Sequence, residues 1–355
     1  MGDKAINERM QARGTRTGQY GGASAMATFG DTPAEFNALR TGCGLYSLTW
    51  RKKLAIRGED RVRWLNGMVT NNIRDLAPGH GLYCFFLNPQ GRIQADLCCY
   101  NLGDSLMVDT DASQFDSLRA AFDKYIIMDD VELAYLGRKA AGVTGPRAPE
   151  VVAGVFPEAR AAELAPLELR SLTWQDAALI LVRGDAVLPS FEIWCDGPTV
   201  PEVWKALAAA GAKPVGTDAL EMIRIWSGRP RFGQDIRERD LPQETGQARA
   251  LHFNKGCYLG QEIVERIHAR GNVHRVFTGI AFTDGPPPAG SKIELAGKEV
   301  GEVTSVATIP GDEGPPLVGL GYVRREAAAP GTAVQVAGVP GRIVKPPFLY
   351  VAAQS

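Results

Sequence analysis

One order of elements occurs twice in this chain, and this repetition constrains its fold more than any other feature. From residue 53 to 135, the hydrophobic pattern predicts a strand, a short helix, three strands, a helix and a further strand. From residue 139 to 210, a strand, a helical turn, three strands and a helix follow in a similar order. The pattern therefore predicts a duplicated α+β unit.

The clearest single element is a helix in the first repeat. Asp111 is a residue type that favours the N-cap position, and Phe115, Leu118, Phe122 and Tyr125 fall on one face at helical spacing. We therefore expect a helix that begins after Asp111 and buries these four side chains.

The last hundred residues have a different texture. After Leu251, short β-rich segments alternate with glycine and proline, which is typical of a small barrel or sandwich. The predicted strands are 277–282, 292–295, 299–307, 317–323 and 333–336. The predicted organisation is a loosely ordered arm (1–29) within a lead-in segment (1–51), two α+β units (52–136 and 137–250) and a β domain (251–355).

Charge and hydropathy exclude several functional classes. The 39 basic and 40 acidic residues leave a formal net charge of -1, so no global field favours nucleic acid or an anionic membrane. The longest aliphatic run, 177–182, is far shorter than the roughly 20 residues that span a bilayer. The glycine-rich N-terminus has no apolar core of the kind found in signal peptides. We expect no nucleic-acid or membrane partner.

The cysteines predict neither a disulfide framework nor a metal site. They form no C-x-x-C pair, and no histidine stands at metal-ligand spacing from them. We therefore expect free thiols in a reducing cytoplasm, most of them buried as small hydrophobic side chains. The six are Cys43, Cys84, Cys98, Cys99, Cys195 and Cys257.

The segment 224–275 is rich in charge and is the densest candidate for chemistry. It has two interpretations: a solvated surface at a domain junction, or a functional site. Cys257 favours the second, because Lys255 precedes it closely, Arg266 follows, and positive neighbours lower the pKa of a thiol.

The residues around Cys257 resemble the signature of the YgfZ family of folate-binding proteins. The resemblance rests on 255–262 (KGCYLGQE), on 241–244 (LPQE), and on Arg266, Gly271 and Arg275. Its motif residues are Lys255, Gly256, Cys257, Tyr258, Gly260, Gln261 and Glu262. The family shares its scaffold with the glycine-cleavage T protein, an aminomethyltransferase that uses tetrahydrofolate. The resemblance implies two ferredoxin-like or βαβ-type units forming a folate-binding cloverleaf, with a small C-terminal β-barrel.

The same resemblance implies a site for tetrahydrofolate or a one-carbon derivative. Glu192 matches the glutamate that grips the pterin, Arg224 an arginine near the same ring, and Asp96 the essential aspartate of the T protein. Tyr83 matches a tyrosine that approaches the folate, and Met68 lies in a matching block, 64–72. A carboxylate suits the adjacent donors of a pterin, and an aspartate can stabilise a developing iminium cation.

Each of these residues also has an ordinary structural interpretation. Glu192 and Asp96 could be charges at strand edges, Tyr83 a core aromatic, and Arg224 part of the polar face of a helix. The chain also departs from the T protein, which carries two adjacent aspartates at Ala95–Asp96 and an asparagine–alanine pair at Asp109–Thr110, and which lacks the cysteine.

The departures favour a YgfZ-like function. The predicted protein binds tetrahydrofolate and assists the assembly or repair of iron–sulfur enzymes, with assembly factors or client enzymes as partners. The alternative is a folate-dependent aminomethyltransferase or methyltransferase in which Asp96 is the main catalytic group. The part of Cys257, as nucleophile, transient ligand or structural residue, is open.

Overall fold

The computed structural model describes residues 14–271, 273–310 and 317–348 of the chain. The chain divides into two compact units. The first comprises Met1–Cys84 and Leu97–Leu220, and the second comprises Phe85–Asp96 and Glu221–Ser355. The division passes through two strands and one helix and does not coincide with the predicted boundaries at 52, 137 and 251, which stay predictions.

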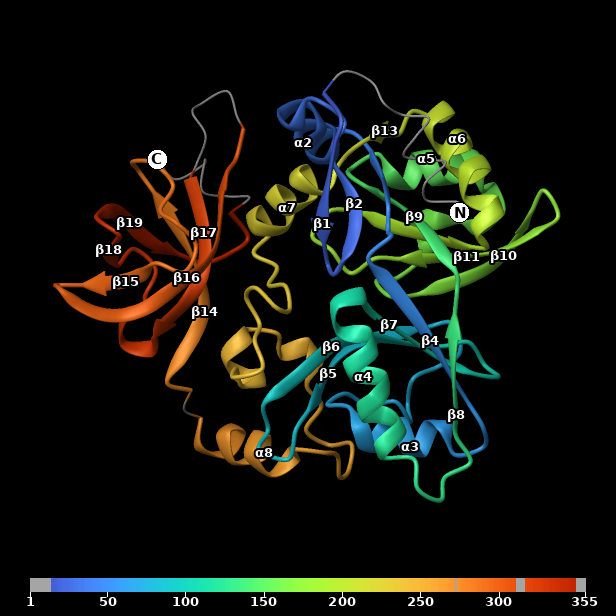
Figure 1. Ribbon diagram of the computed structural model, residues 1–355, viewed down its shortest axis with the longest axis horizontal. Helices are drawn as coiled ribbons and strands as arrows, with labels where there is room; N and C mark the ends of the chain where they lie inside the picture. The colour runs from blue at the N-terminus through green and yellow to red at the C-terminus, as the bar shows by residue number, and fades with distance from the viewer. Residues whose placement is uncertain (1–13, 272, 311–316, 349–355) are drawn as a thin grey trace. The chain divides into compact units, whose positions relative to one another are not determined.

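One five-stranded sheet has the order β5-β6-β7-β4-β8 (Figure 1). Its strands are β4 (Arg51–Arg57), β5 (Gly81–Leu87), β6 (Ile93–Asn101), β7 (Leu106–Asp111) and β8 (Glu132–Leu136). The helices of the same stretch are α3 (Arg61–Met68) and α4 (Ala112–Lys124). All of the strands and both helices were expected from the hydrophobic pattern.

The first unit also contains a six-stranded sheet of order β10-β11-β12-β9-β3-β13. Its strands are β3 (Gly44–Ser47), β9 (Lys139–Thr144), β10 (Leu169–Trp174), β11 (Ala177–Arg183), β12 (Ser190–Cys195) and β13 (Lys213–Pro214). Two helices, α5 (Ala148–Val155) and α6 (Val200–Ala209), cover one face of this sheet (Figure 1). Strands followed by a covering helix recur in both sheets, which agrees with the predicted mixed fold.

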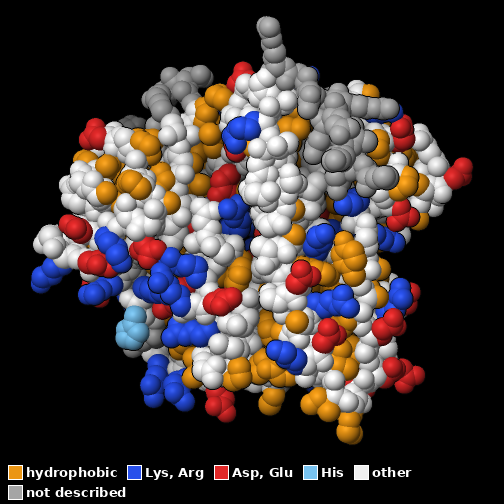
Figure 2. All heavy atoms as spheres, viewed as in Figure 1, with side chains coloured by type: hydrophobic (Ala, Val, Ile, Leu, Met, Phe, Trp, Pro, Cys, Tyr) orange, Lys and Arg blue, Asp and Glu red, His pale blue; other side chains and the backbone are white. Residues whose placement is uncertain are grey.

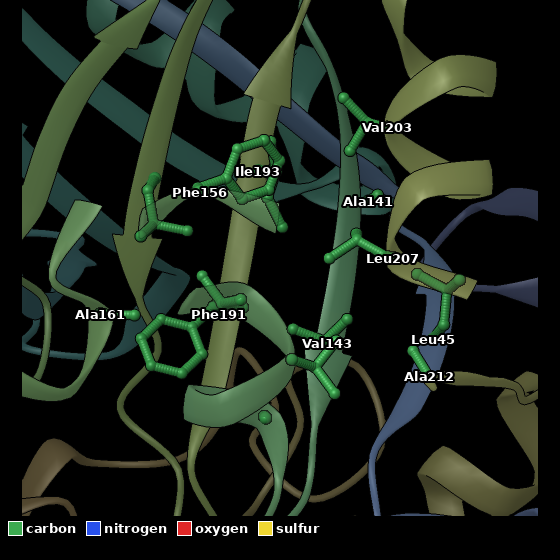
Figure 3. Packing of buried hydrophobic residues seen from close by; sticks show 14 of the residues in the cluster. Leu45, Ala141, Val143, Phe156, Ala161, Phe191, Ile193, Val203, Leu207 and Ala212 are labelled. Atoms are coloured by element: carbon green, nitrogen blue, oxygen red, sulfur yellow. The ribbon is translucent and has the colours of Figure 1, made fainter. Parts of the chain in front are cut away.

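One hydrophobic core cluster of the first unit lies between the six-stranded sheet and its covering helices. Alternate residues of a strand point to opposite faces, so Phe191 and Ile193 of β12 face the helices together. Val143 of β9 and Leu207 of α6 belong to the same cluster, and Figure 3 shows these side chains between sheet and helices. The opposite face of β12 carries Ser190, Glu192 and Trp194.

The α4 prediction was correct in its position and wrong in two details. Phe115, Leu118 and Phe122 are buried as expected, but Tyr125 follows the end of the helix and is 38% exposed. Asp111 occupies the N-cap position, yet its carboxylate makes no capping hydrogen bond. The carboxylate pairs with Arg51 of the neighbouring strand at 2.8 Å. An ion pair with a partly buried arginine has therefore replaced the local cap.

The prediction of a loose N-terminal arm was wrong from residue 16 onward; residues 1–13 lie outside the described part. β1 (Arg16–Tyr20) and β2 (Ala23–Thr28) form an antiparallel hairpin, followed by α2 (Thr32–Thr41). Buried Glu35 joins this segment to the unit, because it accepts hydrogen bonds from the Thr28 hydroxyl at 2.8 Å and the Gly216 backbone N–H at 2.7 Å. Such a long-range contact leaves no local hydrophobic pattern.

The second unit contains the predicted barrel, which is closed and six-stranded. The strand order is β14 (Arg275–Phe282), β17 (Leu317–Arg324), β16 (Lys298–Thr308), β15 (Lys292–Leu295), β18 (Ala333–Val336) and β19 (Val339–Val344). β19 was not predicted, because Pro340 and Gly341 interrupt its pattern. It pairs with both β14 and β18 and so closes the barrel.

Two helices complete the description. They are α7 (Thr217–Trp226) and α8 (Gln261–Arg270), and α8 lies where no element was predicted. Figure 2 shows Lys and Arg side chains mixed with acidic ones on the face that includes β14 and β16. Ion pairs of this kind in the second unit join Glu302 to Arg237 at 2.6 Å and to Arg239 at 3.1 Å. None of the described helices combines the length and the apolar composition needed to cross a membrane.

The core cluster of the first unit yields a direct test of packing. Ile193 is fully buried, so Ile193→Ala removes contacts on all sides, and we expect it to lower the free energy of unfolding by about 2–5 kcal/mol. Ile127→Ala is a matched control, because Ile127 is 82% exposed, and it should change stability by about 0.5 kcal/mol or less. Urea denaturation followed by tryptophan fluorescence measures both. Equal effects of the two substitutions would contradict the packing described.

Candidate functional site

Two adjacent strands of the five-stranded sheet bury a cluster of charged side chains. Lys53 on β4 stands opposite Asp109 on β7, and Arg51 stands opposite Asp111. The side chains of Lys53 and Asp109 are only 1% and 2% exposed, with 3.2 Å between Nζ and Oδ1. Arg51 completes the cluster through 2.8 Å contacts with both aspartates. The first unit thus holds two cations and two carboxylates where a sheet normally buries apolar residues.

The charges of this cluster depend on one another. Burial alone raises the pKa of Asp109, but the positive charges and hydrogen bonds of Arg51 and Lys53 outweigh it, so the pKa is lowered. Burial alone lowers the pKa of Arg51, but Asp109 and Asp111 raise it above its ordinary value. Asp109 is therefore ionised at neutral pH, and Arg51 keeps its charge.

The charge cluster is continued by β12 of the six-stranded sheet. The Lys53 ammonium lies 4.4 Å from the ring centroid of Trp194, which is within the range of a cation–π interaction. The ring of Tyr100 makes a T-shaped contact with the same indole, with 5.1 Å between ring centroids and an interplanar angle of 89°. Trp194 Nε1 donates to Glu192 Oε2 at 2.7 Å. Lys53, Trp194 and Glu192 therefore form a continuous series of contacts within the first unit.

The surroundings of Glu192 are aromatic on one side. Glu192 stands opposite Gly142 on β9, and Gly142 stands opposite Tyr46 on β3. A Cβ at position 142 would lie 2.3 Å from the Tyr46 ring, so only glycine leaves room for that ring. The Tyr46 hydroxyl is 2.9 Å from the Thr144 hydroxyl, and its ring stacks with Trp50 at 6.4 Å. Glu192 thus combines a half-buried carboxylate with nearby aromatic surface.

Two further predicted site residues, Met68 and Tyr83, also lie in the first unit. Met68 is buried at the end of α3, and Tyr83 is buried on β5. The Tyr83 backbone carbonyl accepts a hydrogen bond from the Asn71 side chain at 2.9 Å. Their participation in a ligand site stays a prediction.

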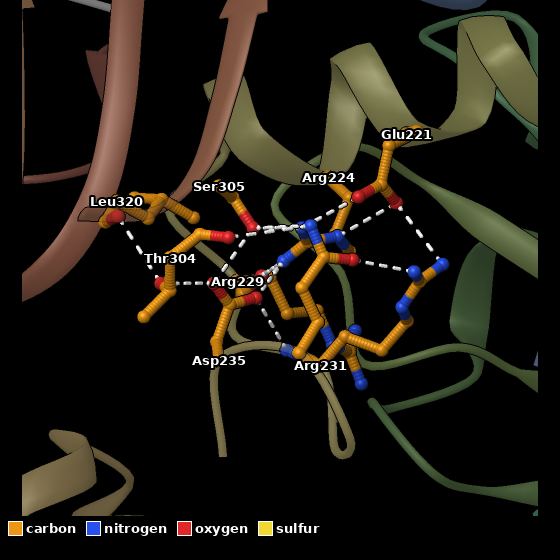
Figure 4. A network of polar contacts seen from close by, with 9 residues as sticks. Glu221, Arg224, Arg229, Arg231, Asp235, Thr304, Ser305 and Leu320 are labelled. Atoms are coloured by element: carbon orange, nitrogen blue, oxygen red, sulfur yellow. Dashed lines mark hydrogen bonds and ion pairs between the residues drawn. The ribbon is translucent and has the colours of Figure 1, made fainter. Parts of the chain in front are cut away.

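Asp96 and Arg224 belong to the second unit. Asp96 is half-buried on β6. Arg224 is buried on α7 and makes a two-pronged ion pair with Glu221, with N–O distances of 2.7 and 2.9 Å. It also contacts Asp235 at 2.6 Å and Ser305 at 2.8 Å, as Figure 4 shows. The guanidinium is therefore held between α7, the following loop and the barrel.

The predicted cysteine motif forms a loop leading into α8. Cys257 is exposed, whereas the other five cysteines, all in the described part, are buried. Lys255 is buried, with Nζ 5.0 Å from the ring centroid of Tyr258. Burial raises the pKa of Tyr258. In the described part of the chain, no three Cys, His, Asp or Glu side chains are grouped as metal ligands.

The structure explains the residue type at two positions of the motif, Gly260 and Gln261. Gly260 has a φ of +81°, which favours glycine. A Cβ at this position would also lie 2.6 Å from the backbone carbonyl oxygen of Asn88, in the turn between β5 and β6, so only glycine fits against that turn. Gln261 Oε1 accepts a hydrogen bond from the Tyr258 backbone N–H at 3.3 Å. The loop is shaped by these contacts, while the Cys257 side chain stays open to solvent.

Comparison with known proteins decides the family. Residues 6–255, well over half of the chain, match the family described as the GCVT N-terminal domain. The chain belongs to this family.

Relatives in other organisms match the chain over most of its length. The chain is 28% identical to an aminomethyltransferase of Stenotrophomonas maltophilia, over 97% of the chain and 95% of that protein. It is 26% identical to a putative chloroplastic transferase of Arabidopsis thaliana, over 91% of the chain and 75% of that protein. The fold matches the glycine cleavage system aminomethyltransferase T of Bartonella henselae with a TM-score of 0.86 and 22% identity, covering 98% and 97% of the two chains.

Sequence reasoning missed part of the charged cluster of this GCVT-family chain. Lys53, Arg51 and Trp194 were not singled out, and Asp109 was noted only as a departure from the T protein. A signal was present, because Lys53 adjoins the apolar run 54–56 and Asp109 follows the apolar run 106–108. Opposite charges inside two otherwise buried strands indicate a pair.

The Asp109–Lys53 pair predicts a large effect of a single substitution. Asp109→Ala leaves the Lys53 ammonium buried without its carboxylate, and we expect the free energy of unfolding to fall by about 3–5 kcal/mol. Asp116→Ala, at an exposed position of α4, is the control and should cost about 0.5 kcal/mol or less. Urea denaturation at several pH values measures both.

The effect of Asp109→Ala also has a defined pH dependence. The pKa of Asp109 is lowered from 3.8, so its contribution is present above pH 3.8 and is lost as the pH falls through the lowered value. The stability difference from wild type should be constant near neutral pH and shrink in acid. A difference that persists undiminished in strong acid would contradict the pairing.

Proposed function

We propose that this chain binds tetrahydrofolate or a one-carbon derivative, and that Glu192 is the carboxylate that receives the pterin ring. The observation that carries the proposal is that a hydrogen bond within the protein holds one oxygen of the Glu192 carboxylate. Trp194 fixes Oε2 from within the protein, and among the described residues no other side chain or backbone group hydrogen-bonds to this carboxylate. Its remaining lone pairs are available to a ligand that offers adjacent N–H donors.

The surroundings of Glu192 fit such a ligand. A flat heteroaromatic ring with donors along one edge can pair with a carboxylate while its faces meet aromatic side chains. Tyr46 supplies such a ring across Gly142 from Glu192. We include Met68 and Tyr83 in the proposed site on the basis of the family resemblance.

Arg224 and Asp96 have different roles in the proposed site. The Arg224 donors already serve Glu221, Asp235 and Ser305, so it would reach a ligand only by giving up one of these contacts. Asp96 is half-buried, and a carboxylate can stabilise the cation that develops in one-carbon chemistry. We propose Asp96 as the catalytic carboxylate and Arg224 as a secondary contact.

We infer that the activity is a folate-dependent transfer of an aminomethyl or methyl group. Membership of the GCVT family and the aminomethyltransferase relatives support this class. Tetrahydrofolate, when bound, accepts and carries the one-carbon unit. On the basis of the family resemblance, Glu192 would orient its ring, and Asp96 would be the carboxylate that stabilises developing positive charge.

A second candidate function is favoured by Cys257. It is an exposed thiol in a loop whose neighbouring residues are held by packing, which suits a protein that meets another macromolecule. In this YgfZ-like function the protein assists the assembly or repair of iron–sulfur enzymes in the cytoplasm, with assembly factors or client enzymes as partners. Both functions require the same folate site.

The folate site is tested by titration. Glu192→Ala removes a charged hydrogen-bond acceptor worth about 1.5–3 kcal/mol, so the Kd for tetrahydrofolate should rise roughly tenfold to a hundredfold. Glu158→Ala, an exposed glutamate of the same unit, is the control and should leave the Kd unchanged. Isothermal titration calorimetry under reducing conditions measures both. Unchanged affinity in Glu192→Ala, or no saturable binding by the wild type, sinks the proposal.

The two functions are separated by two further substitutions. In a transferase, Asp96→Asn should lower the rate of methylene- or methyl-tetrahydrofolate formation by about 10²-fold or more, while Cys257→Ala retains it. In the YgfZ-like function, Cys257→Ala should fail to restore iron–sulfur enzyme activity in cells lacking the native protein. Product analysis and complementation provide the two readouts.

A further inference from the structure

The most unusual side chain in the first unit is Lys53, an ammonium only 1% exposed. Removing an ammonium from water is unfavourable, and a buried ion pair is often no more stable than apolar residues of the same volume. Stability alone therefore does not account for a lysine at this position. Its contacts indicate another role.

Two contacts on different elements hold the Lys53 ammonium. Asp109, opposite on β7, accepts its hydrogen bond at 3.2 Å. On the other sheet the ammonium lies 4.4 Å from the Trp194 ring centroid. Trp194 is fully buried and also makes a T-shaped contact with Tyr100, so the plane of the indole is defined by its neighbours.

Because the indole of Trp194 is held in place, its N–H also fixes the position of Glu192. Residues 192 and 194 point to the same face of β12, and Nε1 donates to Oε2 at 2.7 Å. A cation over the ring face draws electron density from the indole and makes its N–H a stronger donor, as polarised hydrogen-bond chains do. The carboxylate is thereby held in one orientation.

We propose that Lys53 is a positioning residue for Glu192, acting through the face of Trp194. The inference rests on the proposed folate function for its ligand but on the contacts above for its geometry. Asp109 holds the ammonium, the ammonium orients and polarises the indole, and the indole N–H fixes Oε2. The protein thereby fixes the direction of Oε1 and of the second lone pair of Oε2 before the ligand binds.

The competing interpretation is that Lys53 only neutralises Asp109. A double variant separates the two. Lys53→Met/Asp109→Asn removes both charges of the pair, so a purely neutralising lysine becomes unnecessary in it. If Lys53 positions Glu192, the double variant is still defective, because it lacks the cation over Trp194.

The experiment compares Lys53→Met, the double variant and a matched control, Lys52→Met. Lys52 is the adjacent residue, points to the other face of β4, and lies over the Tyr135 ring at 5.5 Å. Each protein is measured for stability by urea denaturation and for tetrahydrofolate affinity by calorimetry. The Trp194 indole signal is followed in ¹H–¹⁵N spectra of ligand-free, ¹⁵N-tryptophan-labelled protein and is assigned by its loss in Trp194→Phe.

We expect the double variant to regain most of the stability lost in Lys53→Met, yet to bind tetrahydrofolate about tenfold more weakly than wild type, a loss of about 1.4 kcal/mol. Its Trp194 indole proton should move upfield. Lys52→Met should match wild type in affinity and in that signal. A double variant with wild-type affinity and an unmoved Trp194 signal overturns the positioning role.

The two proposals fail separately. If wild-type protein does not bind tetrahydrofolate, the proposed function falls, while the Lys53–Trp194–Glu192 geometry is still decided by the indole signal of the ligand-free protein. If wild type binds but Lys53→Met leaves the indole signal unmoved, the folate site stands and the positioning role falls.

Discussion

The first unit is organised around one requirement: the ammonium of Lys53, once buried, needs an opposite charge. Asp109 meets this need from the neighbouring strand, and Arg51 with Asp111 extends the cluster toward the start of α4. Because Lys53 also faces Trp194, the requirement spans both sheets of the unit. One face of β12 can therefore carry Glu192 beside Trp194, while Phe191 and Ile193 on the other face pack against helices.

The second unit meets a similar requirement in a different way. Fully buried Asp235 accepts hydrogen bonds from Arg224, from the Arg231 backbone and from the hydroxyls of Thr304 and Ser305. One carboxylate thus joins α7, the loop after it and a barrel strand (Figure 4). This network explains why the charge-rich segment after α7 is ordered without regular secondary structure over most of its length.

Part of this structure was predictable because its signals are local. The aliphatic run of β11, the helical spacing of Phe115, Leu118 and Phe122, and the glycine-punctuated strands of the barrel are patterns that can be read over a few neighbouring residues. β19 and the β1–β2 hairpin were missed because glycine, proline and polar residues obscure such patterns. α8 was missed because its polar sequence surrounds one fully buried residue, Val264.

The sequence alone determined that this is a mixed α/β chain with a C-terminal barrel, and it singled out Glu192 and Cys257 as residues to examine. Only the tertiary structure decided what surrounds them. Hydrophobic periodicity reports which face of an element is buried, but it does not report which charged residue meets which across two sheets. The contacts from Asp109 through Lys53 and Trp194 to Glu192 join residues 53, 109, 192 and 194, and pairing over such separations is specified by strand register and sheet packing.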